Sequence, residues 1–208
     1  MGLRRTAAAE PLREVVERAH PRDLTGLLEQ LCEGSAEQRR WAARDLAAHP
    51  GCTAALGAQL RTERDAAVRD ALLTTLGSLG SPDAAAALLP LLRSEDARLR
   101  NGAIEVLARM PAAVAPNVPA LLRDADADVR IFTVNLLGDL QHARVLPWLL
   151  DVLAQDSAVN VVAAALEVIA EVGGPEQLPA LRAAQARFAD DPFIGFAVEI
   201  AIGRIESA

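Results

Sequence analysis

Three aspartates at alternating positions, Asp124, Asp126 and Asp128, form one group of potential metal ligands in the sequence. Carboxylates at this spacing open the calcium-binding loop that joins two helices in one class of calcium proteins. Such a loop also needs Gly at its sixth position and Glu at its twelfth, where this sequence has Val129 and Asn135. The sequence therefore predicts no metal site here, and the aspartates need another explanation.

Other residues with catalytic potential are also isolated from possible partners. None of the three histidines, His20, His49 and His142, lies four residues from another or next to a glutamate. The sequence contains no Gly-x-Ser-x-Gly, no Gly-rich phosphate loop and no Cys/His group at zinc spacing. Cys32 and Cys52 lie far apart in sequence, and we expect reduced thiols. We therefore expect a non-enzymatic protein without catalytic residues, metal or cofactor.

The aspartates instead belong to a repeated pattern. An arginine or asparagine recurs 30, 31, 30 and 30 residues apart, at Arg39, Arg69, Arg100, Arg130 and Asn160. Each copy has an aspartate-rich joint, then about a dozen residues with apolar positions three and four apart, as in a core-facing helix. A Gly or Pro then ends the helix, and a shorter apolar segment follows, as in "AALLPLL" and "VLPWLL". The pattern predicts two antiparallel helices per copy.

With its aspartate joint, Val-Arg start and Gly-Pro elbow, this period resembles the short HEAT repeat of phycobilin lyase subunits and many bacterial proteins. The resemblance covers roughly residues 35 to 205. It implies an all-α, right-handed α-solenoid, or armadillo-like superhelix, of about five to six two-helix repeats. We expect residues 1–34, with "PLREVVERA" and "RDLTGLLEQLCEG", to form a helical N-terminal cap that is continuous with a solenoid over residues 35–208.

The joints have a structural interpretation. An aspartate just before a helix accepts N–H bonds at the helix start, contributing on the order of 1 kcal/mol. The arginine at the same level of each copy is expected to reach the aspartate of an adjacent copy, so a ladder of ion pairs would run along the solenoid. Asn160 interrupts this ladder. Either pairing is dispensable there, which we favour, or that level faces a partner.

Composition narrows the classes of function. All 21 basic residues are arginine, which suits a GC-rich bacterial genome, and the net charge is −7. A nucleic-acid backbone would meet repulsion over much of this surface, although a basic inner groove stays possible in an acidic chain. No stretch resembles a secretory signal or reaches the ~18 apolar residues of a membrane span. We expect a cytoplasmic protein that binds neither nucleic acid nor membrane.

The predicted binding surface is the concave face, which we expect the shorter second helices to line. Trp148 stands where the other copies have small or polar residues, so it is a candidate hot spot for a partner. The alternative, which we favour slightly, is that Trp148 packs in the core. The other residues expected to bind a partner on this face are Asn117, Arg123 and Asp151.

The C-terminal segment carries two apolar stripes at helical spacing. One consists of Phe193, Phe196 and Ile200, and the other contains Ile194 and Val198. A terminal repeat should turn a polar face to water. Two apolar stripes therefore predict that a partner protein or a second copy covers this end, the latter giving a homodimer.

These features favour a protein–protein interaction scaffold, adaptor or assembly factor that binds its partner by shape. One alternative is a lyase or chaperone subunit acting on a tetrapyrrole-bearing protein, which is an analogy from fold alone. Visible absorbance of the purified protein would favour it. A second alternative is a DNA-binding HEAT-repeat protein, which salt-sensitive retention on DNA would support.

Overall fold

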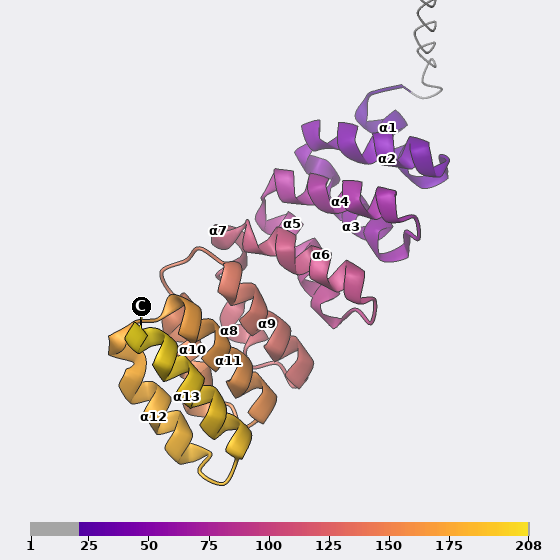
Figure 1. Ribbon diagram of the computed structural model, residues 1–208. Coiled ribbons are helices and arrows are strands. Elements are labelled where there is room, and N and C mark those ends of the chain that lie inside the picture. The colour runs from indigo at the N-terminus through magenta and orange to yellow at the C-terminus, as the bar shows by residue number, and fades with distance from the viewer. Residues whose placement is uncertain (1–20, 208) are drawn as a thin grey trace, which may run out of the picture.

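The computed structural model describes residues 21–207, and within them the helices alternate between two layers (Figure 1). The inner layer contains α2 (Ala36–Asp45), α4 (Ala66–Leu79), α6 (Ala97–Ala108), α9 (Ala127–Asp139), α11 (Val159–Val172) and α13 (Pro192–Ser207). The outer layer contains α1 (Leu24–Glu33), α3 (Thr53–Thr62), α5 (Pro82–Leu88), α7 (Pro111–Val114), α8 (Val118–Leu121), α10 (Val145–Gln155) and α12 (Leu178–Arg187). Short 3-10 turns are η1 (Leu46–Ala48), η2 (Pro50–Cys52), η3 (Leu89–Arg93) and η4 (Pro175–Gln177).

Across the described residues the two layers form six stacked pairs, with α7 and α8 together serving as one outer member. Buried Leu, Val and Ala side chains between the layers form one continuous core, because no two-helix unit can bury its apolar face alone. The prediction of an all-α solenoid of five to six repeats is confirmed. None of the helices between residues 21 and 207 is long and apolar enough to cross a bilayer.

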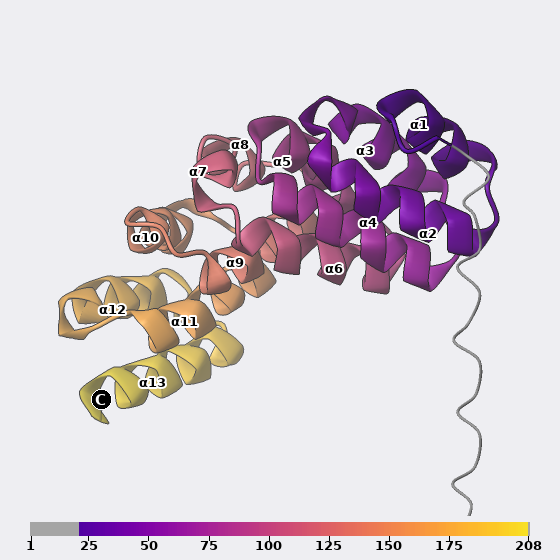
Figure 2. The same ribbon diagram turned by 90° about the horizontal axis from the view of Figure 1, so that it is seen from above.

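The array curves toward its inner layer, so α4, α6, α9, α11 and α13 line the concave side (Figure 2). The prediction that the shorter second helices line this side is wrong, since they form the outer, convex layer. Successive inner helices contact one another along the whole series, whereas a recess separates α8 from α10 in the outer layer. A stack that is packed more closely on one side bends toward that side.

Prolines interrupt the outer helices of two repeats. Pro90 lies in the 3-10 turn η3 that follows α5, and Pro116 separates two four-residue helices, α7 and α8. A proline inside a helix removes one backbone hydrogen bond and clashes with the carbonyl four residues earlier. The outer layer is therefore less regular than the inner layer around α7 and α8.

The predicted helix caps are confirmed at three joints. Asp65 accepts the backbone N–H groups of residues 67 and 68, Asp96 those of residues 98 and 99, and Asp126 that of Asp128. Asp124 accepts the N–H of Asp126 at 2.9 Å and forms an ion pair with Arg93. The alternating aspartates around residue 126 thus start a helix and connect two repeats.

The predicted ladder of arginines reaches the expected aspartate at two levels, Arg69 and Arg130, and a glutamate instead at Arg39. Each arginine donates to a carboxylate of the next joint and to a backbone carbonyl of the joint before its own helix, so it ties consecutive repeats together. The ion pairs are Arg39 with Glu63 (2.7 Å), Arg69 with Asp96 (2.6 Å) and Arg130 with Asp156 (2.7 Å).

The ladder prediction is wrong at Arg100. Its guanidinium donates to the carbonyl of Ser94 at 2.7 Å and lies 4.2 Å from the ring centroid of Phe132, without a carboxylate partner among the described residues. Asp124, in the joint that Arg100 would reach, is paired with Arg93 from the preceding joint. An aromatic ring and a competing arginine, neither part of the repeat pattern, replace the expected ion pair.

The predicted N-terminal cap is described only in its second half. Helix α1 begins at an N-terminal cap residue, Asp23, which accepts the N–H of Gly26, and it packs against α2. The segment "PLREVVERA" lies outside the described residues.

Gly80 is the one described residue with positive φ, 56°, and it ends α4 in the left-handed conformation. We expect Gly80→Ala to lower the free energy of unfolding by roughly 1–2 kcal/mol, since a Cβ disfavours this conformation. Gly203→Ala is the control: Gly203 lies inside α13 with open space where a Cβ would stand, and alanine there should stabilise by about 0.5–1 kcal/mol. Urea denaturation monitored by circular dichroism measures both, and equal effects would contradict this explanation.

Candidate functional site

An apolar groove lies on the concave face of the last three inner helices. It has a volume of about 610 Å3 and is formed by side chains of α9, α11 and α13. Its apolar lining includes Ile131, Ala163, Ala164, Ala170, Phe193, Phe196, Ala197 and Ile200. We refer to these residues as the C-terminal groove.

The aromatic wall of the C-terminal groove comes from α13. Phe193, Phe196 and Ile200 are 54%, 62% and 45% exposed, whereas Ile194 and Val198, on the other stripe, are buried against the core. Both stripes predicted for this segment therefore exist, and the three residues predicted to meet a partner lie together on the solvent-facing stripe. Clusters of large apolar side chains on the surface of a soluble domain mark interaction sites.

The floor of the C-terminal groove is formed by small side chains. Ala163, Ala164 and Ala170 of α11 face Ala197 of α13 across it. Small residues allow another backbone to approach closely, as they do where helices pack against each other. Asn160, which interrupts the arginine ladder, also lines the groove and is exposed.

A few polar side chains also line the groove. Asn135 and Glu167 line it, and Arg204 lies 3.9 Å from Glu171 in an exposed ion pair. A mixed lining of this kind resembles a protein interface, where a polar rim surrounds the apolar centre.

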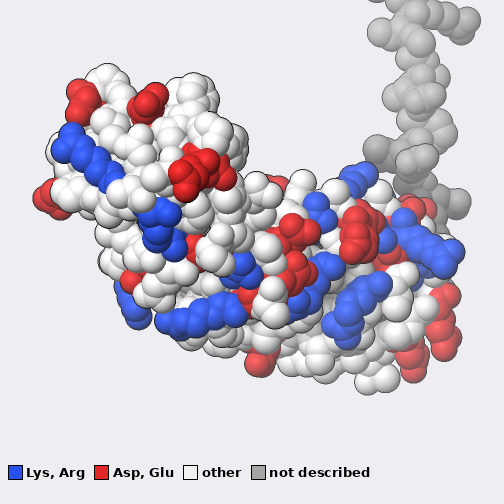
Figure 3. All heavy atoms as spheres, turned by 90° about the horizontal axis from the view of Figure 1, so that it is seen from below, with Lys and Arg blue, Asp and Glu red and all other residues white. Residues whose placement is uncertain are grey.

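The N-terminal half of the concave face differs in chemistry. A recess of about 420 Å3 between α4 and α6 has a mixed lining, in which Asp70, Thr74, Glu105 and Arg109 stand beside apolar side chains. On the side of the molecule shown in Figure 3, arginine and acidic side chains are intermixed, and the outline is indented between the two ends of the array. The recess between α4 and α6 is thus lined by more charged side chains than the C-terminal groove, whose lining is mostly apolar.

Trp148 lies in the core, with only 3% of its surface exposed, so it is not the exposed hot spot of one hypothesis. The alternative prediction, that Trp148 packs in the core, is confirmed. The ring of His142 stacks on the indole at 5.2 Å between centroids, and the guanidinium of Arg144 lies 5.2 Å from the indole centroid. Helix α10 has an apolar face that turns toward α11, and Trp148 belongs to that face.

Arg123 and Asp151 meet Trp148 at a second recess, of about 360 Å3, between α8 and α10. The structure therefore brings together three residues that were predicted to share a surface, but on the outer layer rather than the concave face. Asn117 lies apart from this recess. It precedes α8, is exposed, and donates to the carbonyl of Ala113 at 3.3 Å.

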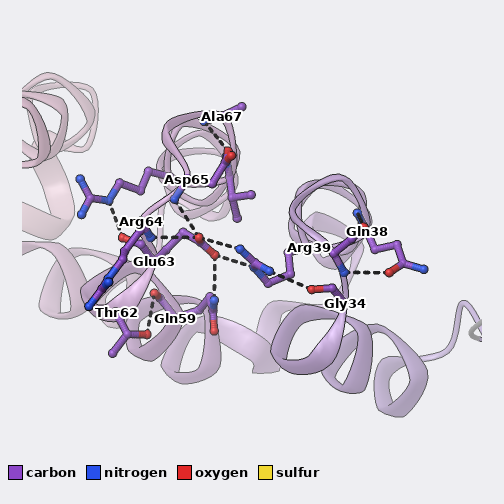
Figure 4. Close-up of polar contacts among 12 residues, drawn as sticks. Gly34, Gln38, Arg39, Gln59, Thr62, Glu63, Arg64, Asp65 and Ala67 are labelled. Carbon is purple, nitrogen blue, oxygen red and sulfur yellow. Dashed lines mark hydrogen bonds and ion pairs between the residues drawn. The ribbon is translucent and has the colours of Figure 1, made fainter.

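Glu63 accepts more hydrogen bonds than any other described carboxylate of the joints, and Figure 4 shows its partners. Its side chain is 2% exposed and accepts Nε and Nη2 of Arg39 at 2.7 and 2.9 Å, the amide of Gln59 at 2.9 Å, and the backbone N–H groups of Arg64 and Asp65. The Arg39 guanidinium, helped by the other donors and opposed by burial, lowers the pKa of Glu63 to about 2. These bonds make Glu63 a structural anchor.

Sequence reasoning missed several of these residues. It expected an aspartate to receive Arg39, and it did not include Ile131, Ala163 or Ala164 in the binding surface. The available signal was weak: the outward positions of α11 carry alanine where a solvent-facing helix usually carries charge. Only the packing of α9, α11 and α13 brings these residues beside the phenylalanines.

The family to which the repeats belong agrees with this architecture. The sequence matches the family model of HEAT repeats over residues 53–118 and 114–203. Among curated proteins, none matches the chain. One similar solved structure is the complex of CpcE and CpcF of phycocyanin lyase from Nostoc sp. PCC7120, with 16% sequence identity and a TM-score of 0.38 over 95% of this chain and 100% of that chain. At this level of similarity the structure carries no information about function.

Proposed function

Because this chain belongs to the HEAT-repeat family, we propose that it is a non-enzymatic scaffold that binds a partner protein on its concave face. The C-terminal groove would hold a helix of that partner. The observation that carries this proposal is the stripe of Phe193, Phe196 and Ile200, exposed beside a floor of alanines.

A helix fits this groove better than a small ligand does. The groove crosses three helices and is open along its length, whereas small-molecule sites enclose most of the ligand surface. An amphipathic helix would place apolar residues, three and four apart, between the phenylalanines of α13 and Ile131 of α9. Large aromatic side chains at the centre of such a contact contribute much of the binding energy.

Two side chains with catalytic potential, those of His142 and Cys52, have structural contacts, which supports a scaffold rather than an enzyme. His142 stacks on Trp148, and its Nδ1 accepts the N–H of Arg144 at 3.2 Å. Cys52 is buried, donates to the carbonyl of Leu46, and has a thiol pKa that burial raises, so it is a poor nucleophile. We also propose that the protein works in a bacterial cytoplasm, where both cysteines would stay reduced.

Phe196→Asp tests the proposal. A tagged protein captures partners from native lysate, and the dissociation constant of the identified partner is then measured with purified proteins by calorimetry. We expect the variant to weaken binding by about 30-fold or more, because it places a charge in the apolar centre of the contact. Leu24→Asp is the control, since Leu24 is 38% exposed on α1, far along the array from the groove.

Light scattering after size-exclusion chromatography distinguishes the two possible occupants. A dimer that Phe196→Asp dissociates would mean that a second copy fills the groove and that the partner is this chain itself. A strict monomer whose partner affinity is the same in wild type and Phe196→Asp would contradict the groove proposal. A coloured sample, with visible absorbance, would favour the tetrapyrrole alternative instead.

A further inference from the structure

The recess between α8 and α10 lies on the outer layer and is separate from the C-terminal groove. Its lining includes Arg123 in the turn that follows α8, Arg144 at the start of α10, and Trp148 and Asp151 of α10. Its volume of about 360 Å3 is enough for a few side chains. The proposed groove uses none of these residues, so the two sites can be tested independently.

Charged groups at the base of this recess are already paired. Arg130 binds both carboxylate oxygens of Asp156, at 2.7 and 3.2 Å, and also donates to the carbonyl of Asp124. The carboxylate of Asp124 pairs with Arg93. These residues fix the joint and leave no free charge for a ligand.

Three donor groups around the recess lack an acceptor of matching charge or geometry. Arg123 is exposed and donates one long hydrogen bond, 3.3 Å, to the carbonyl of Pro119 in the preceding helix α8. Arg144 lies over the indole of Trp148 and forms no ion pair with any described residue. The indole Nε1–H of Trp148 is buried without a hydrogen-bond partner.

A buried N–H without an acceptor is rare in folded proteins and calls for an explanation such as a bound group. Two guanidinium groups beside it select an oxyanion, because guanidinium donates two parallel N–H bonds to such a group. Asp151, exposed on the same recess and without an ion pair in the described part of the chain, would repel a dianion more than a monoanion. This balance favours a carboxylate over a phosphate.

We infer that this recess binds a glutamate or aspartate side chain of an acidic peptide segment, with Arg123 and Arg144 as its partners. Repulsion from Asp151 would limit the bound group to a single negative charge. The recess opens to solvent between α8, a four-residue helix, and α10, so an extended segment can enter without disturbing the helices. The solenoid would then hold a partner on its concave face and an acidic segment on its convex face.

Fluorescence of Trp148 provides the test. The chain has two tryptophans, so Trp41→Phe leaves Trp148 as the only one. The probe is a blocked heptapeptide with central glutamates, and the matched peptide carries glutamines. We expect saturable quenching or a spectral shift with the glutamate peptide, at least tenfold tighter than with the glutamine peptide and weakened by salt.

Further substitutions in the Trp41→Phe protein identify which side chains contact the peptide. Arg123→Gln should weaken binding of the glutamate peptide by about tenfold or more, and Asp151→Asn should tighten it several-fold. Arg182→Gln, an exposed arginine on α12, is the control and should leave the affinity unchanged. Equal binding of both peptides, no effect of Arg123→Gln, or an equal response to free acetate or inorganic phosphate at the same concentration would each overturn the inference.

Discussion

Trp148→Ala is expected to lower the free energy of unfolding by about 3–5 kcal/mol, one of the largest effects of any single change in this chain. The side chain is 3% exposed and packs within the continuous core between the two layers, so truncation leaves a cavity that neighbouring side chains cannot fill completely. It also removes the surface on which His142 stacks. Urea denaturation monitored by circular dichroism at neutral pH measures the loss.

The second tryptophan is the matched control. Trp41 is 37% exposed on α2, with the guanidinium groups of Arg40 and Arg44 5.6 and 5.4 Å from its ring centroid. Trp41→Ala should cost clearly less than Trp148→Ala, because more of the Trp41 ring is already in water and exposed cation–π contacts contribute only about 0.5–1 kcal/mol. Similar losses for the two variants would show that burial does not distinguish the two tryptophans, contrary to the structure.

Glu63→Gln is expected to lower the free energy of unfolding by about 3 kcal/mol at pH 7. The substitution keeps the size of the side chain but removes the charge that compensates Arg39, whose side chain is only 22% exposed. It also leaves the backbone N–H groups of two following residues with a weaker acceptor. Asp70→Asn is the control, because the ion pair of Asp70 with Arg98 is 60% and 69% exposed and such pairs contribute little.

The effect of Glu63→Gln should depend on pH. The pKa of Glu63 falls from 4.5 to about 2 on folding, so its carboxylate stabilises the folded state fully above pH 4.5. That contribution is lost as the pH falls from 4.5 toward 2, and the 2.5-unit difference corresponds to about 3 kcal/mol. The stability difference between wild type and Glu63→Gln should therefore shrink over this range. A difference that stays constant from pH 7 to pH 2.5 would disprove the assigned cause.

Much of the architecture follows from local features of the sequence. The period of 30 residues, the aspartates before helices and the apolar positions three and four apart depend on interactions within one or two turns or between adjacent copies. The same short-range rules predicted the caps at Asp65 and Asp96 and the two stripes of α13. These interactions are encoded close together in the chain, so they can be recognised without the structure.

Other features depended on how the repeats stack. The concave side was assigned to the wrong layer, since curvature arises from small differences in helix spacing that no single repeat contains. Glu63 rather than an aspartate receives Arg39, and Phe132 takes the place of a carboxylate at Arg100, because these contacts join residues of different repeats.

The sequence by itself therefore determined the two-helix repeat, most of its joints and the apolar excess at the C-terminal end. Only the tertiary structure decided that Trp148 is buried while Phe196 is exposed, although both are aromatic residues on amphipathic helices. The physical reason is that exposure depends on whether a neighbouring helix covers that face. Helix α10 has neighbours that bury its tryptophan, whereas the groove-facing side of α13 has none within the described residues.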